Sequence, residues 1–164
     1  MKTGRPTSFT DYYDTKEKIF KLEDIINKLP KGLALAHMDA VPDNFLFIGD
    51  GIRLIDWEYA AMHDPHVDIA MFALNSMYDR EQVEKLIGFY FADGCPYEMR
   101  VKIYCYIAAC GLLCSNWWEY KSLYGAGFDE HSLRQYEYAK EYNEIAVNFA
   151  CQTPSGSLSS IKLL

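Results

Sequence analysis

The chain has 164 residues, enough for one domain of common size with a sizeable buried core. Half of its residues are hydrophobic and 15% are aromatic, which excludes a disordered composition. The formal net charge of −7 argues against a general nucleic-acid-binding protein, because such proteins carry basic patches that neutralise phosphates. An acidic chain weakly favours a cationic ligand.

The cysteines and the first residues indicate a cytoplasmic protein. Five cysteines form an odd set without a C-x-x-C pair, which is typical of free thiols in a reducing compartment. The opening MKTGRPTSFTDYYD is polar and lacks the apolar segment of a signal peptide. The most apolar stretch, 103–118, is shorter than the roughly 20 residues that a membrane span needs. We therefore expect no contact with a membrane.

The first predicted helix follows an irregular start at 1–13. Apolar residues fall at i, i+3, i+4 and i+7 along 22–29, which predicts one buried helical face. The sequence Pro30-Lys31-Gly32 ends this helix, because proline and glycine both disfavour its continuation.

Residues 33–68 hold most of the polar groups suited to chemistry. His37, Asp39 and Asn44 form an H-x-D-x-x-x-x-N pattern, and Asp56 follows twelve residues after Asn44. Phosphoryl transfer needs one carboxylate facing the incoming hydroxyl and other oxygen ligands facing metal ions. Protein kinases use this spacing for that purpose, so the pattern favours a phosphotransferase.

The apolar runs around this motif predict how the loop is held. Runs at 33–36 and 45–48 flank it, and Gly49-Asp50-Gly51 predicts a turn into a third run that ends at Asp56. We expect a strand, the catalytic loop and a hairpin whose far end delivers Asp56.

The segment from about Leu33 to Tyr78 resembles the C-terminal lobe of the choline/ethanolamine kinase family, closest to its bacterial branch. That family lies within the wider aminoglycoside-phosphotransferase and protein-kinase-like group. The matching stretches are H-x-D-x-x-P-x-N at 37–44, LIDWEYA at 54–60, Asp64-Pro65 and DIA at 68–70. The resemblance implies a kinase that uses ATP and Mg²⁺ to phosphorylate the hydroxyl of choline or a related amino alcohol. An aminoglycoside acceptor stays open.

The resemblance also implies a role for each matching residue. Asp39 would be the catalytic base, and Asn44 and Asp56 would ligate magnesium, which prefers oxygen ligands. From the residues alone, a loop-capping Asp39, a turn Asn44 and a strand-end Asp56 stay open. Four further residues would surround the site: Glu58 and Tyr59 beside the acceptor, with His37 and Asp68 as structural supports.

Recognition of a quaternary ammonium group is the second test of the resemblance. Such a group cannot donate hydrogen bonds, so proteins hold it with aromatic faces. The family places its choline-contacting tryptophans late on a long helix, where Trp117 and Trp118 lie here. Adjacent helical residues point about 100° apart, so at most one faces a given pocket, and packing stays equally open for each. Asn75 is a further substrate-binding candidate: it stands where choline kinases usually carry a Glu near the ammonium group, so a neutral amide replaces a carboxylate there and this departure weakens choline as the acceptor.

Four more helices are predicted after the central segment, each with apolar residues at helical spacing. The second of them starts at a cap formed by Asp79 and Gln82, and the third runs from near Pro96 to about Tyr124. The first begins after Pro65 and the last at Asp129. The tail at 153–164 is predicted to be flexible.

The predicted fold is mainly α (α+β), a kinase-like C-terminal lobe over residues 1–152 with a small hairpin at the catalytic loop. A complete kinase adds a strand-rich N-terminal lobe with a glycine-rich loop and a phosphate-pairing lysine. Only 36 residues precede His37, too few for that lobe. We therefore expect a truncated kinase that is poor or inactive alone.

Two other functions remain open. A non-catalytic kinase-like remnant or binding module would keep the fold without the reaction. A metal-dependent hydrolase could use His63, Asp64, His66 and Asp68, but no H-E-x-x-H spacing is present and Pro65 breaks a helix that would align the two histidines.

Overall fold

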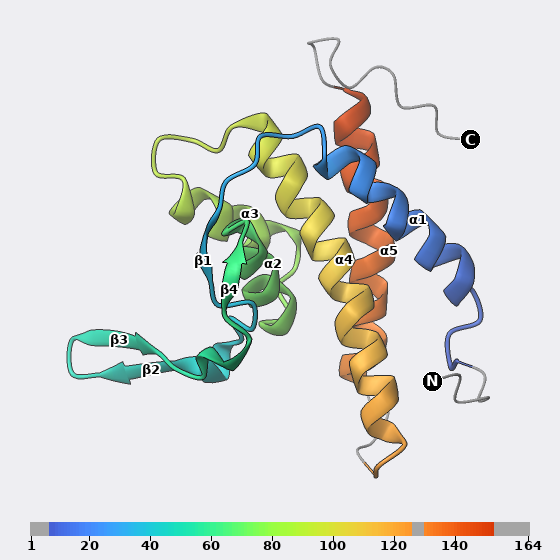
Figure 1. Ribbon diagram of the computed structural model, residues 1–164, viewed down its shortest axis with the longest axis horizontal. Helices are drawn as coiled ribbons and strands as arrows, with labels where there is room; N and C mark the ends of the chain where they lie inside the picture. The colour runs from blue at the N-terminus through green and yellow to red at the C-terminus, as the bar shows by residue number, and fades with distance from the viewer. Residues whose placement is uncertain (1–6, 126–129, 153–164) are drawn as a thin grey trace.

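The computed structural model describes residues 7–125 and 130–152 (Figure 1). The predicted flexible tail lies outside the described residues, as does Asp129. The helices are α1 (Tyr12–Ile26), α2 (His66–Asn75), α3 (Arg80–Tyr90), α4 (Tyr97–Ser122) and α5 (Glu130–Cys151). The strands are β1 (Ala34–Ala36), β2 (Phe45–Ile48), β3 (Gly51–Leu54) and β4 (Ala61–His63), with 3₁₀ turns η1 (Pro42–Asn44) and η2 (Trp57–Tyr59). The prediction of a mainly helical chain with a small hairpin is confirmed.

Helices α4 and α5 form the centre of the molecule, and α1 crosses them on one side (Figure 1). Their contact buries three large aromatic residues, Tyr104, Tyr138 and Tyr142, each at most 1% exposed. Gly111 of α4 allows the close approach, because a Cβ there would lie 2.7 Å from the carbonyl oxygen of Gln135 on α5. Within the described ranges, no helix is long and apolar enough to cross a membrane.

The helices before and after the central segment follow the predicted patterns. Helix α1 buries Ile19, Leu22 and Ile25, although it begins at Tyr12, within the stretch expected to be irregular. Helix α3 starts at a capping box, in which the Asp79 side chain accepts from the backbone N–H of Gln82 at 2.9 Å. The predicted stripe of α1 faces the core, whereas in α3 Val83 and Ile87 are buried and Tyr90, at the end of the predicted stripe, is exposed.

The strands form two separate antiparallel pairs: β1–β4 lies beside α2, and the β2–β3 hairpin projects away from the helical body (Figure 1). The β2–β3 hairpin pairs Ile48 with Gly51 across a tight turn, where Gly49 takes a left-handed φ of 59°. β1 pairs with β4, with Ala36 opposite Ala61, a pairing that the sequence analysis did not predict. Two-stranded pairs are marginally stable alone, so packing on the helical body must support them.

All five cysteines are free thiols, and only Cys151 is exposed. Burial raises the pKa of Cys95 to about 11 and that of Cys105 to about 12, and it raises those of Cys110 and Cys114 as well. Since the thiolate is the reactive form, we expect one fast thiol in the native chain at about pH 8. Titration with a chromogenic disulfide measures this, and Cys151→Ser should abolish the fast phase. A fast phase that survives in Cys151→Ser would show that a buried thiol is accessible.

Candidate active site

The segment after β1 is anchored to the first turn of α2. The Asp68 carboxylate accepts hydrogen bonds from the backbone N–H groups of His37 and Met38, both at 2.8 Å. Hydrogen bonds to a charged acceptor are stronger than neutral ones. Asp68 therefore fixes the direction in which the chain leaves the strand and enters the loop.

His37 joins this loop to the end of the hairpin. Its ring is 1% exposed, and Nε2 lies 2.8 Å from the carbonyl oxygen of Ile55. Nε2 must donate this bond, because a carbonyl oxygen can only accept. The edge of the ring meets Trp57, with 4.8 Å between centroids. His37 thus supports the loop through its contact with backbone, while its buried Nδ1 has no hydrogen-bond partner.

The structure brings the chain positions of Asp39, Asn44 and Asp56 together. The side-chain amide of Asn44 donates to the backbone carbonyl of Asp39 at 2.9 Å. The carbonyl of Asn44 in turn accepts from the N–H of Ile55 at 3.0 Å, one residue before Asp56. The amide nitrogen of Asn44 is used in holding the loop, so its amide oxygen is the atom suited to a metal ion.

Two left-handed backbone conformations flank this site. Met38 has φ 67° and Asp56 has φ 63°, whereas non-glycine residues favour negative φ. Aspartate tolerates this region better than a long apolar residue such as Met38, whose cost is about 1–2 kcal/mol. Residues held in such conformations cluster at functional sites, where the surrounding contacts impose them. At this site, Asp68 holds the N–H of Met38.

The negative charge of Asp39 acts on α4. Burial raises the pKa of the Cys114 thiol to about 12, and the charge of Asp39 adds to this effect.

The two tryptophans lie on the next turn of α4. Trp117 is 48% exposed, and Lys121 sits over its ring at 4.9 Å from the centroid. Trp118 is half-buried, meets the Trp117 ring at 4.8 Å and packs edge-on to His131 of α5 at 5.9 Å. The Trp117 ring thus already has a cation beside it, and the Trp118 ring is fixed between two helices.

The side chains of Asn75 and Glu119 both make hydrogen bonds to other parts of the protein. Asn75 donates to the carbonyl of Met71 at 2.9 Å and accepts from Gln135 of α5 at 3.2 Å, so its amide ties α2 to α5. Glu119 follows Trp118 and accepts from the hydroxyl of Thr7 at 3.0 Å and from the N–H of Ser8. The carboxylate nearest the tryptophans in sequence therefore binds the start of the chain.

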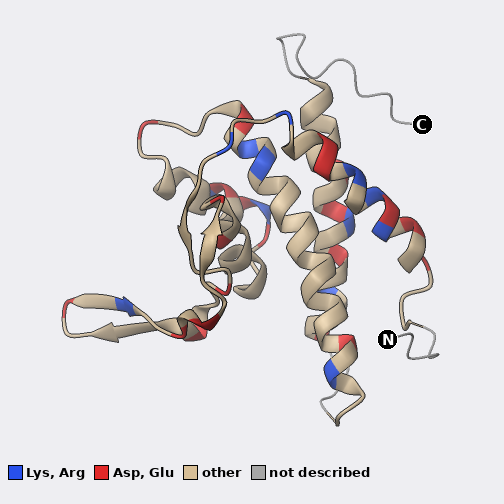
Figure 2. Cartoon of the chain, in the orientation of Figure 1, with Lys and Arg blue, Asp and Glu red and all other residues tan. Residues whose placement is uncertain are grey.

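The base of the hairpin is acidic and open. Glu58 and Tyr59 lie on η2 directly after Asp56, and all three are exposed. Figure 2 shows acidic segments together at this base, whereas the hairpin itself carries few charges. One carboxylate from Asp56 and one amide oxygen from Asn44 form an oxygen donor set of the kind that Mg²⁺ binds together with phosphates. The residues present therefore fit a magnesium ion.

A hollow of about 270 Å³ lies behind the catalytic loop. Its lining is apolar, with Phe45, Leu54 and Phe72 among its residues, and Asp68 is the charged group that reaches it. Since Asp68 already accepts from the loop backbone, the hollow offers little to a polar acceptor.

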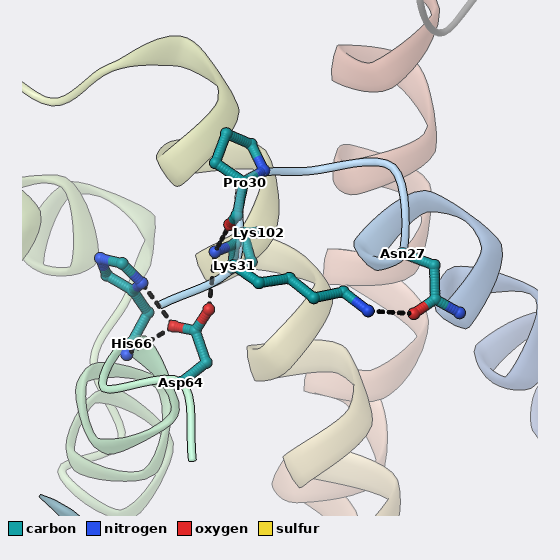
Figure 3. A network of polar contacts seen from close by, with 6 residues as sticks. All are labelled: Asn27, Pro30, Lys31, Asp64, His66 and Lys102. Carbon is teal, nitrogen blue, oxygen red and sulfur yellow. Dashed lines mark hydrogen bonds and ion pairs between the residues drawn. The ribbon is translucent and has the colours of Figure 1, made fainter. Parts of the chain in front are cut away.

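A buried polar network follows β4, and the sequence analysis missed its central residue, Lys102 (Figure 3). The Lys102 ammonium lies 2.6 Å from one carboxylate oxygen of Asp64, and the other accepts from Nδ1 of His66 at 2.6 Å. Lys102 also donates to the carbonyl of Pro30. Within the described chain, no group of three or more His, Cys, Asp or Glu side chains is arranged to hold a metal. Asp64, one of the residues that a metal-dependent hydrolase could use, is thus engaged in an ion pair with Lys102.

This ion pair makes stability depend on pH. Burial raises the pKa of Asp64, but hydrogen bonds from Lys102 and His66 outweigh it, so the pKa lies below the ordinary 3.8. Ionised Asp64 therefore stabilises the fold above about pH 4, and that contribution is lost as the pH falls through the lowered pKa. Urea unfolding from about pH 7 to about pH 3 should show a steeper loss for the wild type than for Lys102→Met/Asp64→Leu. If the free energy of unfolding fell equally with pH in the two proteins, the ionisation of Asp64 would contribute nothing to the pH dependence of stability.

The helical body, the anchored acidic loop and the adjoining hairpin define a kinase-like fold, a class that the solved structures below share. The model of the phosphotransferase enzyme family matches residues 8–104, more than half of the chain. The chain therefore belongs to the phosphotransferase enzyme family.

Comparison with individual proteins narrows the resemblance. Protein LicA of Haemophilus influenzae is 26% identical over 141 residues, which are 78% of this chain and 41% of LicA. The crystal structure of the choline kinase LicA from Streptococcus pneumoniae has a TM-score of 0.71 at 28% identity, covering 86% of this chain and 50% of that one. A structure of LicA in complex with AMP has a TM-score of 0.72 at 26% identity, covering 87% and 50%. The predicted similarity to choline kinases is confirmed, and the chain spans half or less of these relatives.

Proposed function

We propose that this chain is the acceptor-binding and catalytic part of an ATP-dependent kinase that phosphorylates the hydroxyl of choline or a related amino alcohol. Asp39 would take the hydroxyl proton, and Asn44 and Asp56 would hold the magnesium ion that accompanies ATP. The ion, when bound, neutralises charge on the transferred phosphoryl group. Glu58 and Tyr59 lie at the open edge of this site.

The observation that carries the proposal is the hydrogen-bonded link between the two acidic segments. Asn44 donates to the Asp39 carbonyl and accepts from Ile55, so the base and the metal ligand are held on one rigid frame. Phosphoryl transfer depends mainly on such positioning. A binding module would need neither the frame nor the strained backbone at Met38 and Asp56.

The aromatic end of α4 supports a cationic acceptor. Trp117 and Trp118 lie one turn beyond Cys114, whose thiol senses the charge of Asp39. A choline hydroxyl at Asp39 would then place its ammonium group near these rings, where a cation is attracted to the ring face. Lys121 would have to leave the Trp117 ring for that residue to take part.

We infer that the chain alone turns over poorly, because kinases need a nucleotide-binding lobe to cover the phosphates. Large apolar side chains are exposed on the strands beside the site, among them Leu35, Phe47 and Met62. Contiguous exposed apolar surface marks an interaction site more often than free surface. We propose that such a lobe covers these strands in the active enzyme.

Calorimetric titration of choline, ethanolamine, an aminoglycoside and Mg-ATP into the chain tests the proposal. We expect choline to bind, and Trp118→Ala or Trp117→Ala to weaken it by at least tenfold at whichever ring faces the pocket. Phe89→Ala, at an exposed aromatic of α3, is the matched control and should leave choline binding unchanged. Binding of the aminoglycoside alone would change the acceptor class, and binding of no alcohol would contradict the proposal.

A further inference from the structure

Lys102 is one of the most deeply buried charged groups among the described residues, at 1% exposure. Its ammonium pairs with Asp64 at 2.6 Å and donates to the carbonyl of Pro30, and Asp64 also accepts from the N–H of His66 at 3.1 Å (Figure 3). The contacts join three parts of the chain that are far apart in sequence. They are the loop before β1, the turn after β4 and the first half of α4.

These contacts lie at one end of the β1–β4 pair. β1 begins at Ala34 and β4 ends at His63, and these two residues are paired across the sheet. Pro30 lies shortly before β1, and Asp64 directly follows β4. Lys102 therefore binds the two segments that connect to this end of the sheet. The loop at Pro30 is itself braced by Lys31, which donates to the Asn27 side chain at 2.9 Å.

The opposite end of the same pair carries the catalytic residues. Ala36 pairs with Ala61, and beyond them the chain continues to Asp39 on one strand and comes from Asp56 on the other. From Lys102, α4 runs about 18 Å at 1.5 Å per residue to Cys114, the thiol on which the charge of Asp39 acts. Lys102 therefore joins the sheet to the helix at the end of the pair away from Asp39 and Asp56.

The energetics of buried ion pairs make stability a poor explanation for this arrangement. Removing two charges from water costs several kcal/mol for each ion, and apolar pairs of similar volume are often as stable or more stable. An ammonium group between a carboxylate and a carbonyl, however, has direction, which apolar contacts lack. The pair is therefore better suited to fixing a position than to holding the fold together.

We propose that Lys102 is a positioning residue that sets the register of the β1–β4 pair against α4. Because the loop with Asp39 continues from β1 and the tryptophans lie on α4, this register fixes the catalytic base relative to the acceptor pocket. The inference rests on the proposed function for that consequence. The register itself is a property of the free chain.

The test replaces the ion pair by an apolar pair in the full chain, as Lys102→Met/Asp64→Leu. We expect its urea midpoint at pH 7 to equal or exceed that of the wild type. Hydrogen–deuterium exchange without ligand should nevertheless become roughly tenfold faster in peptides covering 34–39 and 61–66, because local opening no longer breaks an ion pair. If the ion pair served stability alone, a double variant with the urea midpoint of the wild type would show the same hydrogen–deuterium exchange in these peptides.

The control is Lys85→Met/Glu81→Leu, which removes an exposed ion pair of 2.8 Å on α3 and should leave the same peptides unchanged. If the Met/Leu pair fails to fold, Lys102→Gln/Asp64→Asn removes both charges with little change in volume, and the same exchange measurement decides. Exchange in 34–39 like that of the wild type, in either folded variant, overturns the proposal.

Choline titration separates this inference from the proposed function. If the wild type binds choline, the variant should bind it at least tenfold more weakly, because small misplacements of positioned groups are costly. Unchanged affinity would overturn the proposed role of the register. If the wild type binds no choline, the proposed function fails, and the exchange result still decides whether Lys102 sets the register.

Discussion

Asp39→Asn is expected to lower the turnover of a completed kinase by about 10²–10⁴-fold, the usual contribution of a positioned general base. The enzyme for this measurement joins the chain to the part of the Streptococcus pneumoniae choline kinase that it does not match. Asparagine has nearly the volume of aspartate, and the bond from Asn44 uses the backbone carbonyl of residue 39. The loop should therefore keep its shape while losing the atom that accepts the proton.

Steady-state formation of phosphocholine measures this loss, and calorimetry should show choline and Mg-ATP affinities within about threefold of the wild type. Asp43→Asn is the matched control, since Asp43 is an exposed acid on the neighbouring turn η1. Its turnover should stay within about twofold of the wild type. Equal losses in the two variants would assign the effect to net charge and remove Asp39 from the role of base.

The sequence was sufficient to predict the elements that depend on local patterns. The buried stripe of α2, the capping box at Asp79 and the hairpin at Gly49 follow from spacing and turn chemistry within a few residues. The loop between Asp39 and Asn44 could also be predicted, because its length and flanking strands fix where those residues lie. Their chemical roles stay predictions.

Contacts between distant segments could not be predicted in this way. Lys102 lies 38 residues from Asp64 and 72 from Pro30, and a lysine in a helix carries no mark of its partner. Glu98 and Arg100 stand close before it in α4, so its charge alone did not set it apart, and its place directly before the uncharged stretch 103–118 was the available signal. To identify Asp64 as the partner of Lys102, one must know where β4 lies. The pairing of β4 with β1 depends on tertiary structure and could not be predicted from local patterns.

The acceptor pocket shows a similar limit. Helical spacing predicted that Trp117 and Trp118 point in different directions, and the two rings meet at 85°. It could not predict that the start of the chain returns to bind Glu119, because Thr7 lies 112 residues away. The carboxylate that the sequence places beside the tryptophans is therefore engaged in hydrogen bonds to the start of the chain.

Gly111→Ala is expected to destabilise the chain by about 3 kcal/mol, the upper part of the range for overpacking a core. The new Cβ would lie 2.7 Å from the carbonyl oxygen of Gln135 and 2.9 Å from the amide nitrogen of Ala139. Both atoms belong to the backbone of α5, so relief requires the two central helices to separate. The helix preference for alanine offsets about 1 kcal/mol at most.

Thermal unfolding should show a midpoint lowered by roughly 6–12 °C, as expected for a chain of this length. Gly88→Ala provides the control, because Gly88 lies within α3 and a Cβ there would meet nothing within 4 Å. That substitution should raise the free energy of unfolding by about 0.5–1 kcal/mol through helix preference alone. A Gly111→Ala midpoint at or above that of the wild type would mean that α4 and α5 do not approach this closely. The loss should also reach the acceptor region, because separating the helices pulls Trp118 away from His131, the contact that fixes its ring.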